Sequence, residues 1–545
     1  MGTSRIAILL ALTALPGLAS AATFRVGTGA GCTHATIQDA IDAAAGDPGT
    51  NDFIRITRSA TYDDVALDIH DQDVVLVGGY VNCLDEVGDG QRTVLNGDGD
   101  HSVVRIHGDG DVGLRYLTLS GGHEPLFSYG YGGGIQIYGG PHVVNADHLF
   151  VTNNEAGHGG GISLRNDVSG DPNQNRLVLG DDVVISFNHA EYTAGAYSLV
   201  QGGGIFCYES SVQMTGGGTT SILANTASFD GGGIGAIECD LEIAPHGTYG
   251  SFNGIVLNEA GRDGGGLLVE GFSGGNTRFY VTDANRPVYV AGNSAEREGG
   301  GIKINTGATV YAWELIVDGN RSLAEGGGVS ISDGGSDGDS ALYMLSETDA
   351  LDPAPPAAVN CAAALACNSL SGNIARDASN EPQAAAAVRV RNDPPFGAFG
   401  NASAVLRGTR VAGNSGRNLV RVIEMPDFGD IGDAYASFDN ASITGNDVSE
   451  ALMQTGAAPT NDDHDALHIE DSTIAGNLIG GPAAIASHHA ITLRSSIVWQ
   501  PGRQVLHLSE GTPDVDASST CLAAISMKSR RRRRTSSPIR ASVIP

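Results

Sequence analysis

The densest group of titratable residues in the chain lies at residues 461–468, in the segment NDDHDALH. It contains the carboxylates of Asp462, Asp463 and Asp465 and the imidazole of His468. Carboxylates that lie close together raise one another's pKa, so one can donate a proton while another accepts one. These four residues are therefore candidates for acid–base catalysis. A solvated turn before a strand explains the same residues equally well, and both interpretations are kept.

The segment NGDGDH offers a second kind of chemistry, because Asp98 and Asp100 could supply oxygen ligands to Ca²⁺. The spacing does not match the loop of an EF-hand, and ordinary Asp-Gly turns have the same composition. We therefore expect no cofactor, with Ca²⁺ at Asp98 and Asp100 as the exception to test.

The element that organises the chain is a run of three glycines followed by an aliphatic residue. In seven copies this residue is Ile135, Ile162, Ile205, Ile234, Leu267, Ile302 and Val329, and successive copies lie 27, 43, 29, 33, 35 and 27 residues apart. A period of about 30 residues with variable spacing is typical of stacked coils from which insertions loop out. Dividing the chain by this repeat predicts about twelve coils.

An asparagine recurs in the same repeat, three residues after an aliphatic or aromatic one. The copies nearest the glycine runs are Asn153, Asn188, Asn225, Asn258, Asn293 and Asn320, and the pattern continues to Asn477. Asparagines stacked at equivalent turns hydrogen-bond from coil to coil. We therefore expect a structural role for these residues and a solenoid that continues to near residue 500.

After each glycine run the residues alternate, which predicts a strand with one face in the core. The outward columns of this strand read Gln136, Ser163, Phe206, Gly235, Leu268, Lys303 and Ser330, then Tyr138, Arg165, Tyr208, Ile237, Glu270, Asn305 and Ser332. These columns contain no group of carboxylates. The aromatic residues Tyr138, Phe206 and Tyr208 are candidates for stacking on sugar rings, although cover by inserted loops is an equally simple explanation.

The start of the chain has the features of an exported protein. Residues 1–21 combine Arg5, an apolar run and the small residues Ala19, Ser20 and Ala21, which is typical of a secretory signal peptide. Residues 22–50 predict a strand and a short helix with an apolar stripe at Ile37, Ala40, Ile41 and Ala44. Such a helix would cap the open end of a β-solenoid.

Residues 51–521 form the solenoid, with insertions expected at about 120–131, 190–201 and 333–370. The tail at residues 522–545 has no acidic residue and a block of five arginines. Two interpretations remain open for it: a polybasic segment that binds an anionic surface, or a frameshifted or disordered end. No later apolar run is long enough to span a bilayer.

The cysteines and the charge fit an extracellular location. The chain has seven cysteines, of which Cys32 and Cys83, and Cys361 and Cys367, are expected to form disulfides. Cys207 and Cys239 stand at different offsets from their glycine runs, which makes them doubtful partners unless the register shifts locally. With 62 acidic and 31 basic residues the chain has a net charge of −31, which repels nucleic acid.

The helix segment ATIQDAIDAA and the repeats together resemble right-handed parallel β-helix proteins of the pectin lyase-like superfamily. The repeats are also similar to those of bacterial polymorphic outer-membrane proteins, which pair a GGA-aliphatic motif with Phe-x-x-Asn; here GGG replaces GGA, and Phe150 to Asn153 keeps the phenylalanine. The resemblance implies an all-β fold, a right-handed parallel β-helix with a capping helix. It does not fix an activity, because many functions share this fold.

The resulting expectation is a secreted or outer-membrane-associated scaffold, adhesin-like and monomeric, whose partner is an extracellular carbohydrate or a cell surface. No catalytic site is identifiable in the strand columns. The alternative is a polysaccharide lyase or glycoside hydrolase that acts on an acidic polysaccharide, which the superfamily makes plausible. Grouped carboxylates and cations on one exposed face would favour the enzyme.

Overall fold

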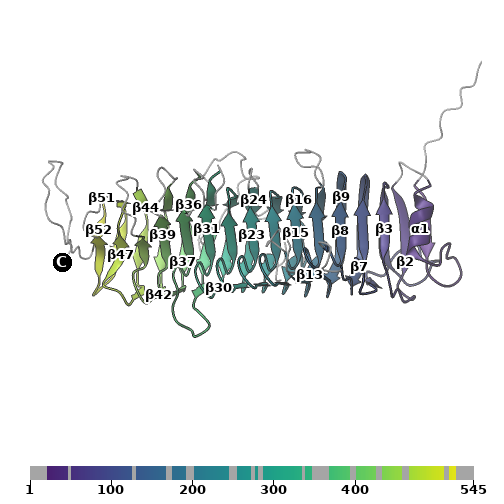
Figure 1. Ribbon diagram of the computed structural model, residues 1–545, viewed down its shortest axis with the longest axis horizontal. Helices are drawn as coiled ribbons and strands as arrows, with labels where there is room; N and C mark the ends of the chain where they lie inside the picture. Colours follow the sequence, from purple (N-terminus) through teal and green to yellow (C-terminus); the bar gives the residue numbers. More distant parts are fainter. Residues whose placement is uncertain are drawn as a thin grey trace, which may run out of the picture.

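The computed structural model shows one continuous solenoid (Figure 1). It describes residues 21–46, 51–124, 130–166, 175–191, 202–244, 254–271, 276–279, 287–333, 338–345, 368–392, 400–424, 433–456, 465–508 and 515–522. Parallel strands stack coil upon coil in sheets of 28, 14 and 10 strands, which we call sheets A, B and C. The fold is therefore a right-handed parallel β-helix, as expected.

Sheet B supplies one strand per coil, and its 14 strands show that the estimate of about twelve coils was low. The strands are β3 (Leu67–His70), β6 (Val104–His107), β8 (Ile135–Tyr138), β11 (Ile162–Arg165), β15 (Ile205–Tyr208), β19 (Ile234–Ile237), β23 (Leu267–Glu270), β27 (Ile302–Asn305), β31 (Val329–Asp333), β35 (Val388–Asn392), β39 (Val420–Glu424), β43 (Met453–Thr455), β47 (Ala483–Ser487) and β50 (Gln504–Leu508).

Sheet A contains two columns of strands, joined by the long strands β7 and β9 that run through both. The first column is β1 (Thr23–Val26), β2 (Asp52–Thr57), β4 (Val74–Tyr80), β7 (Gly110–Ser120), β9 (His142–Thr152), β12 (Arg176–Leu179), β16 (Ser211–Met214), β20 (Asp240–Ile243), β24 (Asn276–Phe279), β28 (Thr309–Ala312), β32 (Ser340–Met344), β36 (Ala402–Arg407), β40 (Ala434–Asp439), β44 (Asp465–Glu470), β48 (Ala490–Arg494) and β51 (Val515–Ser518). The second is β5 (Thr93–Asn96), β13 (Val184–Ser186), β17 (Ser221–Leu223), β21 (Gly254–Val256), β25 (Val288–Ala291), β29 (Leu315–Asp318), β33 (Asn368–Ser371), β37 (Thr409–Ala412), β41 (Ser442–Thr444), β45 (Thr473–Ala475), β49 (Ile497–Trp499) and β52 (Cys521–Leu522).

Sheet C is a ladder of two-residue strands at the corner between sheets A and B. Its strands are β10 (Glu155–Ala156), β14 (His189–Ala190), β18 (Thr226–Ala227), β22 (Glu259–Ala260), β26 (Ser294–Ala295), β30 (Arg321–Ser322), β34 (Ile374–Ala375), β38 (Ser415–Gly416), β42 (Asp447–Val448) and β46 (Leu478–Ile479). In the coils from β11 to β31 the chain therefore runs through sheet B, both columns of sheet A, sheet C and a glycine triplet before it returns to sheet B.

The helix α1 (Ile37–Ala44) covers the N-terminal end of the solenoid, as its apolar stripe predicts (Figure 1). The hydroxyl of Thr36 accepts a hydrogen bond from the amide of Asp39 at 3.1 Å, which caps the helix N-terminus. The predicted stripe residues Ile37, Ala40, Ile41 and Ala44 are all buried.

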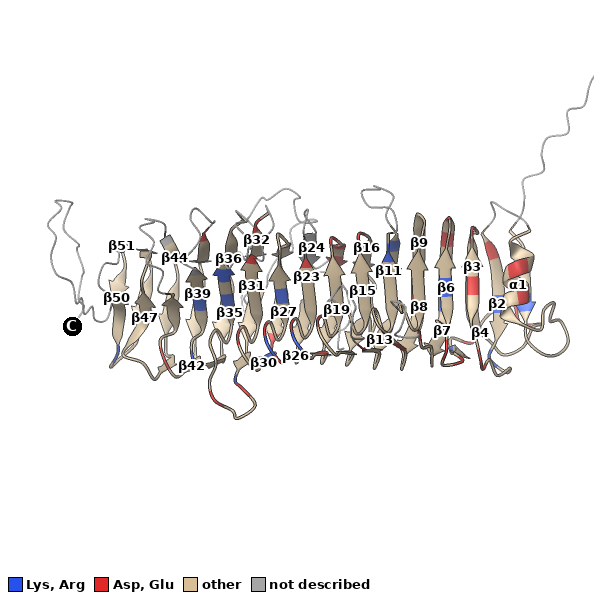
Figure 2. Ribbon diagram, viewed as in Figure 1, with Lys and Arg blue, Asp and Glu red and all other residues tan. Residues whose placement is uncertain are grey.

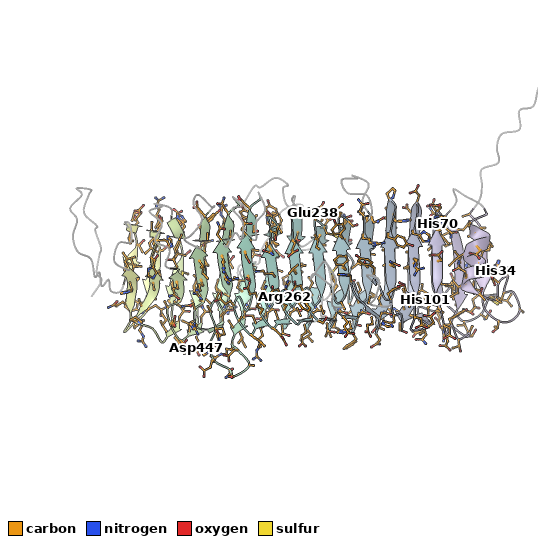
Figure 3. The ribbon with its side chains drawn as sticks, viewed as in Figure 1. His34, His70, His101, Glu238, Arg262 and Asp447 are labelled. Atoms are coloured by element: carbon orange, nitrogen blue, oxygen red, sulfur yellow. A yellow bond between two sulfur atoms is a disulfide. The ribbon has the colours of Figure 1, made fainter. Side chains whose placement is uncertain are left out.

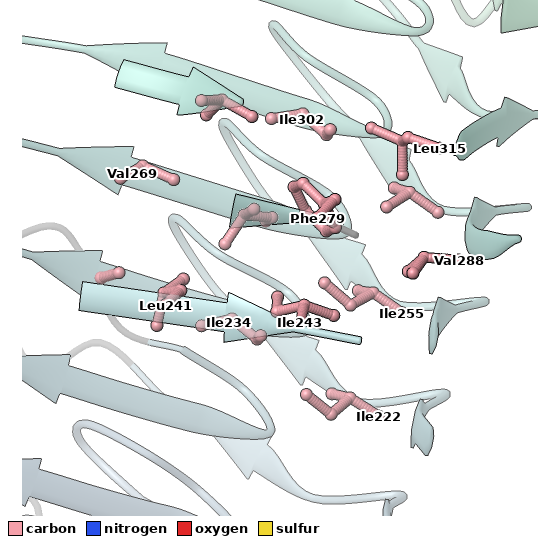
Figure 4. Packing of buried hydrophobic residues seen from close by; sticks show 14 of the residues in the cluster. Ile222, Ile234, Leu241, Ile243, Ile255, Val269, Phe279, Val288, Ile302 and Leu315 are labelled. Carbon is pink, nitrogen blue, oxygen red and sulfur yellow. The ribbon is translucent and has the colours of Figure 1, made fainter. Parts of the chain in front are cut away.

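The core consists of aliphatic ladders, in which each residue packs on its counterpart one coil away. Ile234, Leu267 and Ile302 are adjacent in the register of sheet B and at most 1% exposed. In sheet A, Ile222 pairs with Ile255 and Val288 with Leu315 in the same way, and Figure 4 shows these residues in the core. The alternation seen in the sequence therefore fixes which face of every strand is buried.

The asparagine ladder is present and fully buried, but its first member is Asn154 and not the predicted Asn153. At a typical step the Asn258 amide donates to Asn293 Oδ1 at 3.0 Å and to the Ile222 carbonyl at 3.0 Å, and its Oδ1 accepts from the Asn225 backbone amide at 2.9 Å. Asn154 makes the equivalent contact with Asn188 at 3.0 Å. Asn153 is exposed.

The error has a simple origin in the register. Ile185 pairs with Val151 and not with Phe150, so the ladder motif of this coil is Val151 to Asn154. Asn153 has a φ of 56°, a conformation that Asn tolerates better than most residues. The Phe-x-x-Asn resemblance at Phe150 therefore does not correspond to the ladder.

The glycine triplet makes the corner that leads into sheet B. Gly264 has a φ of +66°, which favours glycine. A Cβ on Gly265 would overlap the carbonyl of Ser294 in the next coil, and one on Gly266 would lie 2.9 Å from the Asn293 amide nitrogen. The corner is therefore close-packed backbone, and the residue that precedes each triplet is held at the edge of sheet B.

Candidate functional site

An open pocket of about 460 Å³ lies on the outer face of sheet B, over β6, β8 and β11. Strand alternation positions its floor, since residues flanked by buried Ile106, Ile137 and Leu164 point outward. The wall comes from the segment before the first glycine run. The lining residues are Arg105, Glu124, Gly130, Tyr131, Gln136, Tyr138 and Arg165.

Arg165 is held against two aromatic rings of the pocket. Its guanidinium carbon lies 4.5 Å from the centre of the Tyr131 ring and 5.3 Å from that of Tyr138. Stacking on aromatic faces is favourable for a guanidinium and keeps it planar and oriented. The N–H donors of a stacked guanidinium lie in its plane, where they match the oxygens of a carboxylate.

The ring faces themselves are occupied, which corrects the expectation that Tyr138 and Phe206 stack on sugar rings. Tyr138 has the His107 ring at 5.1 Å along the helix axis in addition to Arg165. Phe206 is 4% exposed and lies 6.0 Å from the Tyr131 ring. The pocket therefore presents polar edges and guanidinium groups rather than open aromatic faces.

Tyr208 stands behind the pocket, packed against a small apolar cluster of Phe206, Ile237 and Leu268. Its hydrogen bond to Glu209, together with burial, raises the pKa of Tyr208 to about 12. The hydroxyl therefore remains protonated at neutral pH. Tyr208 supports the site, while Tyr138 is the predicted residue that lines it.

A second arginine stands at the other side of the pocket. Arg105 donates to Gln136 Oε1 at 3.1 Å and to Glu124 Oε1 at 3.0 Å. Glu124 also accepts from the amide and hydroxyl of Ser102, at 3.0 and 2.9 Å. These bonds fix Arg105 in place, and its side chain is still 35% exposed, so it can share its donors with an anionic ligand.

The outer face of sheet B is basic, although the chain as a whole has a net charge of −31. Figure 2 shows blue, the colour of Lys and Arg, on β6, β11, β27, β35 and β39. The outward basic residues of the strands are Arg105, Arg165, Lys303, Arg389, Arg391 and Arg421, and the outward acidic ones are Asp68 and Glu270. Four of these cations are paired with glutamates beside the strands: Arg105 with Glu124, Lys303 with Glu298, Arg389 with both Glu298 and Glu325, and Arg421 with Glu325.

A buried ion network occupies the same face further along the solenoid. Glu298 Oε2 lies 2.7 Å from Lys303 Nζ and 2.6 Å from an Arg389 nitrogen, and Arg389 and Arg421 both pair with Glu325, at 2.5 and 2.9 Å. Lys303 and Arg389 are at most 4% exposed. Buried charges in such a cluster are stable only as partners of one another.

The titration of this network follows from its contacts. Burial acts to raise the pKa of Glu298, but Lys303 and Arg389 outweigh it and hold the pKa at about 2. Burial lowers the pKa of Lys303. Because each charge faces an opposite one within the network, these residues lock adjacent coils together rather than await a ligand.

A related pair lies at the edge of the sheet, where Arg262 binds Asp230 and Arg297 binds Asp263. Figure 3 shows Arg262 at this edge. Burial raises the pKa of Asp230 to about 7, against the hydrogen bond from Arg262. The carboxylate of Asp230, which is buried, therefore changes its charge near neutral pH.

These carboxylates lie outside the strand columns. Asp230, Asp263, Glu298 and Glu325 each stand directly before a glycine triplet, so strand positions alone do not reveal them. Isolated bridges pair Asp263 with Glu298 and Glu298 with Glu325, so the column is continuous. Their shared position before the triplet was a signal that the sequence already contained.

Of the predicted catalytic group, the structure describes the side chain of His468, which does not line this pocket. Asp462 and Asp463 lie outside the described residues, as does the side chain of Asp465 at the start of β44. His468 lies on sheet A and its Nε2 is 3.3 Å from Glu470. His468 therefore lies on sheet A, whereas the pocket lies on sheet B.

The calcium candidates form a local turn. Asp98 Oδ1 accepts from the amides of Asp100 and His101 at 2.8 and 2.9 Å, and Oδ2 lies 2.7 Å from His101 Nδ1. This is the Asp-Gly turn that the sequence offered as the alternative. Within the described ranges no group of three or more His, Cys, Asp or Glu residues is placed to hold a metal ion.

Two disulfides join neighbouring coils. Cys32 is bonded to Cys83, with Cα atoms 5.0 Å apart. Cys207 is bonded to Cys239, with Cα atoms 6.0 Å apart, so the prediction against this pair was wrong. Cys207 is an inward residue of β15, and Cys239 follows Glu238, which has a φ of 48°; both cysteines are fully buried. Cys361 and Cys367 lie outside the described residues, and Cys521 is an exposed free cysteine.

Comparison with known proteins gives a single distant structural likeness. No protein-family model matches the chain, and no curated protein matches it. The solved A-module of a mannuronan C-5 epimerase from Azotobacter vinelandii is 13% identical, with 91% of this chain and 95% of that chain covered at a TM-score of 0.36. Among the described residues, no helix has the length and hydropathy needed to cross a membrane.

Proposed function

We propose that the protein is a secreted or surface-associated scaffold that binds an acidic carbohydrate, free or on a cell surface, through the sheet B pocket. The observation that carries this proposal is Arg165, stacked on Tyr131 and Tyr138 in an open pocket. Its in-plane donors suit a carboxylate, as do those of Arg105 on the opposite side.

The rest of the lining suits a sugar. The side chains of Gln136 and Glu124 and the two tyrosine hydroxyls supply donors and acceptors for ring hydroxyls. A pocket of about 460 Å³ has the size of a small-ligand site. Uronic acids combine a carboxylate with several hydroxyls, and the proposed ligand is therefore a uronate-containing oligosaccharide.

The test compares the affinities of acidic oligosaccharides with those of their carboxyl-reduced, uncharged forms. Titration calorimetry on the oxidised full chain uses oligomers of galacturonate, glucuronate and mannuronate, each paired with its carboxyl-reduced form. We expect at least one acidic series to bind, about tenfold or more tighter than its reduced form, and to weaken as salt rises. Equal affinity for a reduced form, or no binding in any series, would refute the proposal.

A polysaccharide lyase or hydrolase remains the second candidate, and the ion network around Lys303 is the observation in its favour. A lysine with a lowered pKa beside glutamates is a general-base arrangement. However, Lys303 is 4% exposed and paired with Glu298. Binding is therefore preferred, and release of reducing ends or unsaturated uronates from the same oligomers would reverse this preference.

A further inference from the structure

The pocket continues as a row of polar side chains toward the N-terminal end of the solenoid. The second outward position of four successive sheet B strands holds His70, His107, Tyr138 and Arg165. His70 pairs in register with His107, and His107 with Tyr138. The ring centres are 4.4 and 5.1 Å apart, so the row is unbroken from strand to strand.

The row becomes more open with distance from the pocket. The His107 side chain is 24% exposed and that of His70 is 55% exposed. Figure 3 shows His70 on the part of the sheet nearest α1. The rings of His107 and Tyr138 are stacked and that of His70 is tilted by 30° to His107, so the row consists mainly of ring edges.

The row changes character on the other side of the pocket. Beyond Arg165 the same column continues with Tyr208, whose hydroxyl is bonded to Glu209, and then with Ile237, which is 7% exposed. The neighbouring column holds Phe206 and Leu268, which are 4% and 1% exposed. We therefore expect a ligand longer than the pocket to extend toward His107 and His70.

Both histidines are paired with aspartates, which bears on the kind of ligand group they suit. His107 Nε2 lies 3.0 Å from Asp68 Oδ1, and His70 Nε2 lies 3.1 Å from Asp71 Oδ2. These carboxylates offset any positive charge on the imidazoles, which makes this part of the row suited to hydroxyl groups rather than to a second carboxylate.

We propose that His107 and His70 form two further saccharide subsites, so that the ligand is an oligosaccharide lying along the helix axis with one acidic unit in the pocket. This inference rests on the proposed function. The row ends at α1, where the Gln38 side chain bonds the backbone of Asp68 at 2.9 and 3.0 Å. From Arg165 to His70 there are three coil steps, roughly 14 Å at the usual strand spacing.

The length of the row sets the length dependence of binding. Affinity should rise from dimer to tetramer by about tenfold, as the ligand gains contacts with His107 and His70, and should then stay constant from tetramer to octamer because the row has ended.

The experiment measures the affinity of oligosaccharides of two, four and eight units, each with one uronate at its end and neutral sugars in the other units, for the full chain and for three variants. The double variant His70→Ala with His107→Ala should lose the gain from dimer to tetramer and keep the affinity for the dimer. His107→Phe keeps the stacked ring but has no ring nitrogens, and should lose part of the same gain. The matched control is His148→Ala, which removes a ring stacked on Tyr116 of sheet A at 4.5 Å and should change nothing.

The outcomes separate the two proposals. Failure of every oligomer to bind refutes the proposed function. Binding that does not depend on length, or a gain that survives in the double variant, refutes the row while the pocket stands. A melting temperature of the double variant equal to that of the wild type excludes a folding defect. If the double variant melts at a lower temperature, the affinities of His107→Phe decide between the outcomes, because this variant retains the stacked ring.

Discussion

The guanidinium carbon of Arg165 lies 4.5 Å above the centre of the Tyr131 ring. The two residues come from adjacent coils, Arg165 from the end of β11 and Tyr131 from the position before a glycine triplet. The solenoid brings them together because the triplet fixes the edge of sheet B while strand alternation turns Arg165 outward. A basic, stacked side chain thereby faces solvent on a chain that is otherwise acidic.

The asparagine ladder should carry much of the stability of the coils. Asn258→Ala leaves the Asn225 amide, the Ile222 carbonyl and the Asn293 side chain with unmade hydrogen bonds, and each unsatisfied buried group costs about 1–3 kcal/mol. We expect a loss of at least about 3 kcal/mol from the free energy of unfolding, measured by guanidinium denaturation.

Asn153→Gly is the control for this prediction. Asn153 is exposed with a φ of 56°, which glycine adopts easily. Its effect should stay below about 1 kcal/mol. A larger effect at Asn153 than at Asn258 would mean that the ladder does not begin at Asn154.

Glu298 should anchor the buried ion network. Glu298→Gln leaves the buried cations Lys303 and Arg389 without one of their anionic partners, and removal of one member of a buried ion pair costs about 3–5 kcal/mol. Glu296→Gln changes the same charge at an exposed position two residues away and should cost less than about 0.5 kcal/mol.

The pH dependence of the Glu298 contribution has a definite sign. Its pKa is about 2 in the folded protein, below the ordinary value of 4.5, so its stabilisation is complete above pH 4.5 and is lost as the pH falls toward 2. The difference in melting temperature between wild type and Glu298→Gln should therefore shrink over this range. A constant difference would show that the carboxylate is not held in its charged form.

Asp230 should have the opposite effect. Its pKa is raised from 3.8 to about 7, so between these values the folded state holds a proton that the unfolded chain has released. Stability therefore falls as pH rises through this window, by up to about 4 kcal/mol. Melting temperatures at pH 5 and pH 8 should differ less in Asp230→Asn than in the wild type.

The exposed Asp447→Asn is the matched control for Asp230, and its pH profile should follow that of the wild type. If Asp230→Asn also leaves the profile unchanged, Asp230 is ionised throughout the window and Arg262 holds it in that state.

The sequence was sufficient for the fold because its signals are local and repeated. The glycine triplets set the register of sheet B from Ile135 to Val329, and this register also placed Tyr138 beside Arg165. It failed at Asn153, where two adjacent asparagines made the motif ambiguous by one residue. It also failed at Cys207 and Cys239, because Cys239 lies beyond the end of β19, after the positive φ of Glu238, where strand offsets no longer apply.

The site was harder to predict because half of it lies outside the strands. Tyr131 and Glu124 belong to the connection before a triplet, and their approach to Arg165 and Arg105 depends on the path of that connection. The availability of ring faces also depends on neighbours, since Phe206 and Tyr138 are covered in ways that column positions alone do not show.

The central claim is that the sheet B pocket binds an acidic carbohydrate through Arg165, and the most direct measurement compares two arginine variants. Arg165→Ala and Arg176→Ala remove the same charge from the same coil, but Arg176 lies on β12 of sheet A. We expect Arg165→Ala to weaken binding of the uronate tetramer by about tenfold or more, and Arg176→Ala to leave it unchanged. Equal losses in both variants would show that only the overall charge matters, and an unchanged affinity in Arg165→Ala would contradict the account.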